Sequence, residues 1–309
     1  MMIPHLSWLL LLLPALVAST TVGKLFDRLP TNPKPLIFAN EIEINNKGGH
    51  LQGVQRYFFK AQEYLFLSGS SSTYGYLAVA HQGKVRKLHR LMFKPFKHAG
   101  GFQIHQDWLA VGIEDNEARN TSVVHVYKLA DPLVDLPAPL GVIERSGEWE
   151  RATAGAVAIS QRGQTLWVVV GDWGNRHMDY YRADLRSSSA KLEFQRAGEV
   201  DMVNGSRKDW IDPVARAYQN INLFVFENQL YLAGFAGDEP SGDNVLDVFT
   251  VDLDSASPVI TKVYSRRFAP IPTTKFRWGA GMSFDGGSHV AIYACGDNIR
   301  KTVEVAVYR

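Results

Sequence analysis

The chain has 309 residues and a formal net charge of +2, with 46% hydrophobic and 21% charged residues. This composition is that of a globular protein and excludes an intrinsically disordered chain. The near-neutral charge, with basic residues scattered along the chain, leaves no electrostatic footprint for nucleic acid, so we expect no nucleic-acid partner.

Residues 1–19 have the pattern of a secretory signal peptide. The apolar segment Leu9–Val17 is followed by the small residues Ala18 and Ser19, and it is too short for a comfortable membrane-spanning helix. The first eight residues contain no Lys or Arg, which departs from the usual pattern and leaves a retained anchor as the alternative. We predict cleavage near Ser19, a secreted or periplasmic protein, and no membrane span after cleavage.

The rest of the chain divides into residues 20–35, predicted as an N-terminal extension, and a single domain over residues 36–309. Short runs rich in Val, Ile, Tyr and Phe, bounded by Gly, Asp, Asn and Ser, predict strands throughout this domain. Because no long segment has a sustained helical period, the predicted fold class is all-β.

An internal repeat organises these strands. Residues 50–55 and 98–103 share His, Gly and Gln in the same register, and three looser copies follow. The five copies begin at His50, His98, Thr153, Asn220 and Trp278. A strand unit repeated at this spacing is typical of an array of similar small sheets.

Each copy continues with further predicted strands. The second strands are Tyr64–Leu67, Trp108–Ile113, Leu166–Val170, Leu230–Phe235 and Val290–Ala294. The third strands are Tyr76–Ala80, Val123–Leu129, Asp179–Leu185, Val245–Leu253 and Val303–Tyr308. More polar fourth strands, which suit an outer edge, are Val85–Phe93, Leu140–Arg145, Leu192–Val200 and Ile260–Phe268.

The fifth copy has no fourth strand of its own, but an unassigned strand, Leu36–Ile44, precedes the first copy. Pairing Leu36–Ile44 with Val303–Tyr308 closes a ring and leaves no unit short of an edge strand. Over residues 36–309 the pattern resembles the β-propeller superfamily, of the exported five-bladed type. A degenerate sixth blade between Thr153 and Asn220, or another β fold, is the alternative.

The resemblance implies that the innermost strands line a central channel and that the loops before them meet at its mouth, together with the loops between second and third strands. The residues expected to bind a ligand there are His50, His98, Thr153, Asp172, Trp173, Asn220, Asp238, Trp278 and Asp297. Imidazoles, carboxylates, an amide and indoles suit a small polar ligand, with Trp as an apolar platform.

Structural roles compete with ligand binding. Asp residues in the loops can cap turns, and Gln55 and Gln103 can satisfy backbone groups between blades. Inner-strand glycines are predicted to permit close backbone approach near the axis; they are Gly53, Gly101, Gly155 and Gly281. The only cysteine, Cys295, is expected to be buried as a small apolar residue, with a catalytic thiol as the alternative.

His50 and His98 begin neighbouring copies and are expected to share one rim of the channel. Two imidazoles with the carboxylate of Asp115 can bind a divalent metal, which is the one cofactor the sequence suggests. The alternatives for the two histidines are structural bonds to the neighbouring blade, and ligand or proton-transfer chemistry.

Three classes of function remain open. The first is an exported propeller that binds a small polar ligand, a glycan or a protein partner at the loop-rich mouth. The alternative is an exported hydrolase or lyase, metal-assisted or not, that uses His50, His98 and loop carboxylates. Five-bladed glycosidases place carboxylates where the inner strands begin, whereas this sequence has His, His, Thr, Asn and Trp there. The third class is a scaffold with a protein-binding outer surface.

Overall fold

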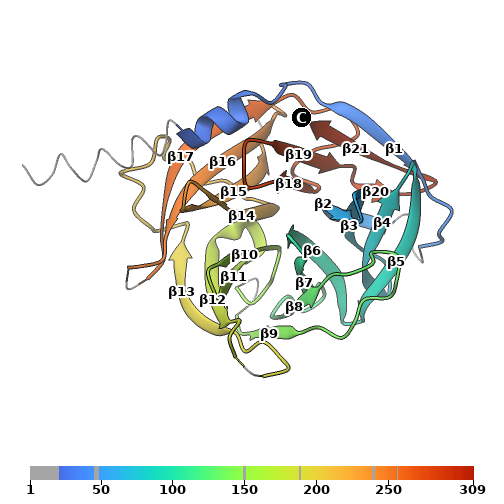
Figure 1. Ribbon diagram of the computed structural model, residues 1–309, viewed down its shortest axis with the longest axis horizontal. Coiled ribbons are helices and arrows are strands. Elements are labelled where there is room, and N and C mark those ends of the chain that lie inside the picture. The colour runs from blue at the N-terminus through green and yellow to red at the C-terminus, as the bar shows by residue number, and fades with distance from the viewer. Residues whose placement is uncertain (1–20, 45–48, 149–150, 188, 239–240, 256) are drawn as a thin grey trace, which may run out of the picture.

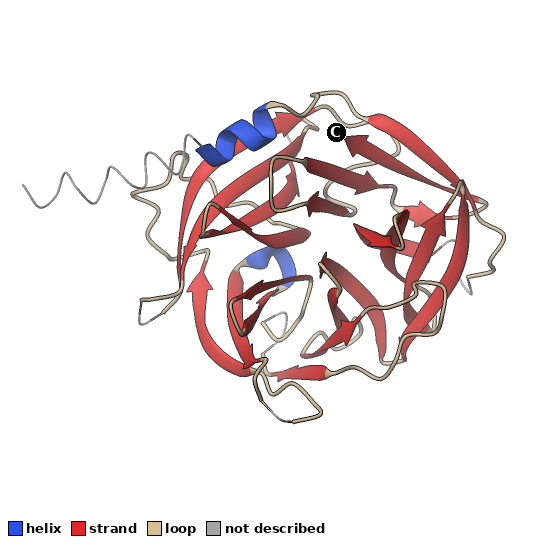
Figure 2. Ribbon diagram, viewed as in Figure 1, coloured by secondary structure: helices blue, strands red, loops and turns tan. Residues whose placement is uncertain are grey.

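The computed structural model describes residues 21–44, 49–148, 151–187, 189–238, 241–255 and 257–309. These residues form mostly strands, as the sequence predicts (Figure 2). The expected signal peptide lies outside the described residues. Within the part of the chain that is described, no helix has the length and apolar character needed to cross a membrane.

The strands of the first four predicted copies pair in chain order into antiparallel sheets. The first sheet contains β2 (Gly49–Phe59), β3 (Gln62–Ser70), β4 (Tyr74–His81) and β5 (Lys84–Phe93). The second contains β6 (Phe96–His105), β7 (Trp108–Asp115), β8 (Thr121–Lys128) and β9 (Gly141–Ser146). The third contains β10 (Ala156–Arg162), β11 (Thr165–Gly171), β12 (His177–Asp184) and β13 (Gln195–Asp201). The fourth contains β14 (Asn220–Phe226), β15 (Gln229–Gly237), β16 (Asn244–Asp252) and β17 (Val259–Phe268).

The last sheet takes its outer strand from the N-terminal side of the chain. It contains β18 (Ala280–Phe284), β19 (Val290–Cys295), β21 (Thr302–Tyr308) and β1 (Lys34–Ala39). The expected pairing between the first and last strands is observed, with Leu36 opposite Val305. The strand ends at Ala39 and not at Ile44, because the Asn40 side chain bonds the backbone of Ile42 and turns the chain.

The sheets are arranged around a common centre (Figure 1). The innermost strands β2, β6, β10, β14 and β18 each contact the next, and β18 contacts β2. A short strand, β20 (Asn298–Ile299), also joins the last sheet to the start of β2. The second and third strands pack between neighbouring sheets; β4 and β7 are buried along their whole length and therefore carry no polar alternation.

Glycines near the centre allow the inner strands to approach closely, as predicted. A methyl group on Gly281 would lie 1.9 Å from the Val54 carbonyl oxygen, and one on Gly101 would lie 2.4 Å from the Gln219 oxygen. A methyl group on Gly53 would lie 2.9 Å from the Asn220 side-chain oxygen, which is also too close. The prediction is wrong for Gly155, where an added methyl would make only ordinary contacts at 3.5 Å or more.

A helical segment at residues 21–27 belongs to the domain core. Its buried side chains Val22, Leu25 and Phe26 pack with residues of the fourth and fifth sheets. Tyr264 on β17 donates a hydrogen bond of 2.7 Å to Asp27, and Arg266 bonds the carbonyl oxygen of Leu29 at 2.7 Å. The predicted extension is therefore docked against β17.

The long interval between the third and fourth copies is a loop. Residues 202–219 are all described and contain no strand, so no further sheet lies there. Trp210 donates to the Ile260 carbonyl oxygen at 3.2 Å, and Tyr218 donates to Asp247 at 2.6 Å. These bonds hold the loop against the fourth sheet.

Candidate functional site

The first residues of the inner strands meet at one end of the central axis. The rings of His50 and His98 stack with their centroids 6.4 Å apart. His98 lies opposite Ser70 in the bridge between β6 and β3, and Gly101 pairs with Ala156 at the start of β10. The sequence-based expectation that these starting positions converge is thus observed for His50 and His98.

Buried amides seal the axis just below this end. Asn220 is fully buried and donates to the Gln52 carbonyl oxygen at 2.9 Å. Gln55 donates to the Asn222 side-chain oxygen at 3.2 Å, and that oxygen also accepts from the Met282 backbone at 3.1 Å. Asn220 therefore joins two sheets and is not exposed to a ligand, which corrects its predicted role.

Gln103 is the most fully bonded of these amides. Its side-chain oxygen accepts from the backbone N–H groups of Ile159 at 2.9 Å and Leu223 at 2.8 Å, and its nitrogen donates to the Leu223 oxygen at 2.7 Å. One side chain thus links the second, third and fourth sheets. The predicted role of satisfying backbone groups between blades is observed for Gln103, whereas Gln55 bonds the Asn222 side chain instead.

A buried carboxyl group lies beside His98. Glu114 is 2% exposed, its Oε1 accepts the Ala154 N–H at 2.7 Å, and its Oε2 lies 3.8 Å from His98 Nε2. Burial raises the pKa of Glu114 to about 7, and burial with the nearby charge of His50 lowers the pKa of His98 to about 4. Between these values both groups are neutral, so they contact each other without forming an ion pair.

Opposing effects of pH on stability follow from these two groups. The folded-state pKa of Glu114 is raised from 4.5 to about 7, so its contribution to stability declines as pH rises through that range. The folded-state pKa of His98 is lowered from 6.5 to about 4, so its contribution grows as pH rises through that range. In the wild-type protein the two trends oppose each other.

Glu114→Gln is expected to leave only the His98 trend, so that the free energy of unfolding rises by about 2 kcal/mol between pH 4 and 6.5. His98→Gln is expected to leave only the Glu114 trend. The free energy of unfolding should then fall by about the same amount between pH 4.5 and 7. Chemical denaturation at successive pH values measures both profiles. If the two variants gave parallel profiles, the assignment of these pKa shifts would be wrong.

The loop between β11 and β12 brings three predicted residues together. Asp172 is buried and accepts from the backbone and Nδ1 of His177, at 3.0 and 2.8 Å. The Thr153 hydroxyl oxygen accepts the Trp173 N–H at 2.7 Å. The Trp173 ring is half-buried, and the Arg119 guanidinium lies over one face at 4.2 Å. Asp172 and Thr153 therefore hold this loop, and Trp173 is its partly accessible member.

The fourth and fifth copies place their predicted residues differently. Trp278 is half-buried, with Lys275 Nζ 5.5 Å from its ring. Asp297 is exposed, and its backbone oxygen accepts from His50 Nδ1 at 3.0 Å. Asp238 forms an ion pair with Arg267 on the edge strand β17 and bonds Ser241 at 2.7 Å. Asp238 therefore stabilises its own loop and links that loop to the edge strand β17.

The predicted metal set is not assembled. Among the described residues no group of three or more His, Cys, Asp or Glu side chains could hold an ion. Asp115 follows Glu114 on β7 and so faces the opposite side of the strand. Its carboxylate accepts the N–H groups of Glu117 at 2.9 Å and Ala118 at 3.1 Å, which is turn capping.

Cys295 is fully buried, and burial raises the pKa of its thiol. A thiol that resists ionisation is a poor nucleophile. The prediction of a buried apolar residue is confirmed, and the alternative of a catalytic thiol is not supported.

A large cavity lies at the other end of the inner strands, where the sequence predicted no site. Its volume is about 1000 Å³, and its lining includes Arg56, Phe58, His105, Phe284 and Arg309. These residues lie in the last positions of β2, β6 and β18, or directly after β21, and belong to no recognisable motif. Their only sequence signal is the cluster of aromatic and basic side chains near strand ends.

Comparison with solved structures supports the fold. The catalytic domain of the Coprinopsis cinerea GH62 α-L-arabinofuranosidase matches with a TM-score of 0.51 at 9% identity, covering 91% of this chain and 98% of that one. The GH43 endo-arabinanase from Bacillus licheniformis matches with a TM-score of 0.45 at 12% identity, covering 85% and 96%. No family profile and no curated protein sequence matches the chain. The chain has a β-propeller fold, as the sequence resemblance implied.

Proposed function

We propose that the chain is an exported, secreted or periplasmic, five-bladed β-propeller, closed by the pairing of β1 with β21, that binds a glycan without cleaving it. Its ligand site is the end of the axis where His50, His98, Trp173 and Trp278 lie. The observation that carries this proposal is that His50, Trp173 and Trp278 are half-buried, with His98 12% exposed beside them, above the fully buried amides Gln55 and Asn220. A sealed axis with partly accessible aromatic and polar groups provides a shallow platform suited to sugar rings.

Binding without cleavage is favoured by the positions of the carboxylates. Glycoside hydrolysis uses a pair of carboxyl groups flanking the bond that breaks. The starts of the inner strands carry none, and Asp172 is fully engaged with His177. The hydrolase alternative keeps one supporting observation: the pKa of Glu114, raised to about 7 by burial, gives the protonated carboxyl that a general acid needs.

Trp278→Ala tests the proposal. Calorimetric titration of the purified protein with arabino-, xylo- and hexose-based oligosaccharides is expected to find a ligand, and the variant is expected to bind it about tenfold more weakly. Phe58→Ala, which removes a 52% exposed ring at the other end of the axis, is the matched control and should bind normally.

Two results would overturn the binding proposal. One is the absence of binding to every oligosaccharide in the panel. The other is release of reducing sugar from a bound oligosaccharide by the wild type but not by Glu114→Gln, because that pattern identifies Glu114 as a general acid and the chain as a hydrolase.

A further inference from the structure

The cavity of about 1000 Å³ is separate from the proposed glycan platform. It lies where β2, β6, β14 and β18 end, with Gln103 in its lining, and the buried amides Gln55 and Asn222 lie in the inner strands between the two. Helix 21–27 and the residues that follow it form one wall through Leu25, Arg28 and Leu29. A pocket of this volume is large enough for a molecule of drug size.

Aromatic rings form one side of the cavity. Phe284 and Phe224 meet edge to face with centroids 5.5 Å apart, and Tyr57 lies beside them in the lining. Phe58 is 52% exposed. Phe224 and Tyr57 are buried, so Phe58 and the half-buried Phe284 are the rings that offer an apolar surface to a flat or hydrocarbon body.

Three guanidinium groups face the same cavity. Arg56 lies 3.9 Å over the Phe58 ring, 3.4 Å from Glu63 and 3.4 Å from the Ser283 hydroxyl, which fixes its orientation. Arg309 lies 3.5 Å from the same Glu63. Because Arg56 and Arg309 share the single carboxylate of Glu63, the three side chains together keep a net positive charge.

The remaining charges do not reverse this excess. Arg28 is exposed and forms no ion pair with any described residue. The two carboxylates in the lining already have partners: Asp107 pairs with Lys128 at 2.6 Å, and Asp285 bonds His289 at 2.8 Å and the Gly287 N–H at 2.9 Å. Cations beside exposed aromatic rings favour a ligand that is both anionic and apolar.

We propose that this cavity is a second binding site, for a small organic anion whose apolar ring body lies on Phe58 and Phe284 and whose acidic group is held by Arg56 and Arg28. The site is independent of the glycan platform, and its loss would not affect the proposed function.

A pair of matched fluorescent probes tests the proposal. 8-Anilinonaphthalene-1-sulfonate carries the anion on an aromatic body, and N-phenyl-1-naphthylamine has the same body without the charge. The purified protein is expected to bind the sulfonate saturably and about tenfold more tightly than the neutral amine, because only the sulfonate uses the guanidinium groups.

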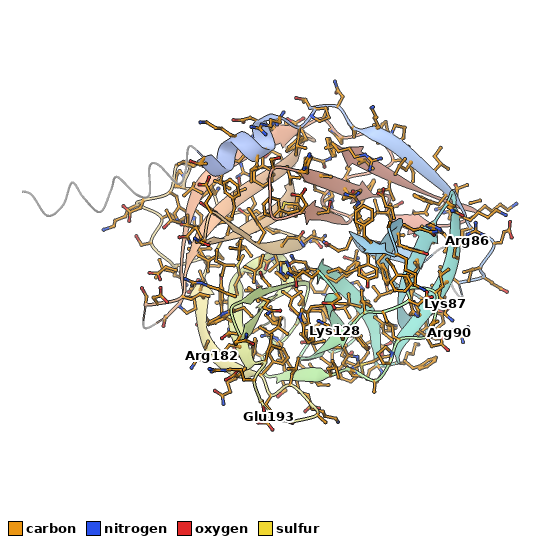
Figure 3. All side chains as sticks on the ribbon, in the orientation of Figure 1. Arg86, Lys87, Arg90, Lys128, Arg182 and Glu193 are labelled. Atoms are coloured by element: carbon orange, nitrogen blue, oxygen red, sulfur yellow. The ribbon has the colours of Figure 1, made fainter. Side chains whose placement is uncertain are left out.

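Arg56→Gln is expected to weaken sulfonate binding about tenfold, and Arg28→Gln about threefold, with no change for the neutral amine. Arg182→Gln on β12, which is exposed at the outer rim of the molecule (Figure 3) and does not line the cavity, is the control and should bind as the wild type does. Arg28 is exposed, so its variant decides the question even if Arg56→Gln fails to fold. Equal affinity for the two probes, or unchanged sulfonate affinity in Arg28→Gln, would overturn the proposal.

Discussion

Gln103→Leu is expected to lower the free energy of unfolding by about 4 kcal/mol. The replacement has a similar volume, so it opens little space, but it leaves two backbone N–H groups and one carbonyl oxygen in the interior without their partner. Each buried polar group that loses its hydrogen bond costs about 1–3 kcal/mol. Since the three groups belong to Ile159 and Leu223, the loss weakens contacts between three sheets at once.

Urea denaturation followed by tryptophan fluorescence measures this loss. Gln195→Leu on β13 is the matched control, since Gln195 is exposed and surface replacements of this kind usually change stability by less than about 0.5 kcal/mol. A loss below about 1 kcal/mol in Gln103→Leu would mean that the amide bonds do not hold the axis together.

The strands could be predicted because their signals are local. Runs of Val, Ile, Tyr and Phe ended by Gly, Asp or Asn place β7, β11 and β15 close to their observed bounds. The end of β1 was missed because the Asn40 turn depends on side-chain bonds to Ile42 and to Arg300, far along the chain.

The segment that contains helix 21–27 has a helical signal in its sequence. Val22, Leu25, Phe26 and Leu29 have the spacing of one apolar helical face, and all four are buried. The segment is too short for a sustained period. Its helix is stabilised by packing against β17 and not by its own propensity.

In the candidate site, the sequence could predict only those neighbours that occupy equivalent positions in the repeat. That register brought His50 and His98 to one rim, and their rings are indeed neighbours. It could not show that Asn220 bonds the Gln52 carbonyl oxygen, because that contact spans 168 positions. The second cavity escaped prediction for the same reason, since its lining comes from strand ends and turns that share no motif.

An ion cluster around the buried Asp179, which joins the second and third sheets, gives the other large expected effect. Asp179 on β12 is 3% exposed and accepts from Arg145 at 2.6 Å, Arg151 at 2.7 Å and Arg196 at 2.8 Å. Burial alone would raise the pKa of Asp179, but the bonds from Arg151 and Arg196 and the charge of Arg145 outweigh it and hold this pKa well below its usual value of 3.8.

Asp179→Asn is expected to lower the free energy of unfolding at pH 7 by about 3 kcal/mol, because it leaves the nearly buried Arg145 guanidinium without a counter-charge. A depressed folded-state pKa gives stability that is full above about pH 4 and is lost as pH falls below it. The difference in free energy of unfolding between wild type and Asp179→Asn should therefore shrink from pH 5 to pH 2.

Asp184→Asn is the control, because it breaks an exposed pair with Arg186. It should leave the free energy of unfolding and its dependence on acid nearly unchanged. A difference that stays constant in acid would show that Asp179 stabilises the sheet by shape and not by charge.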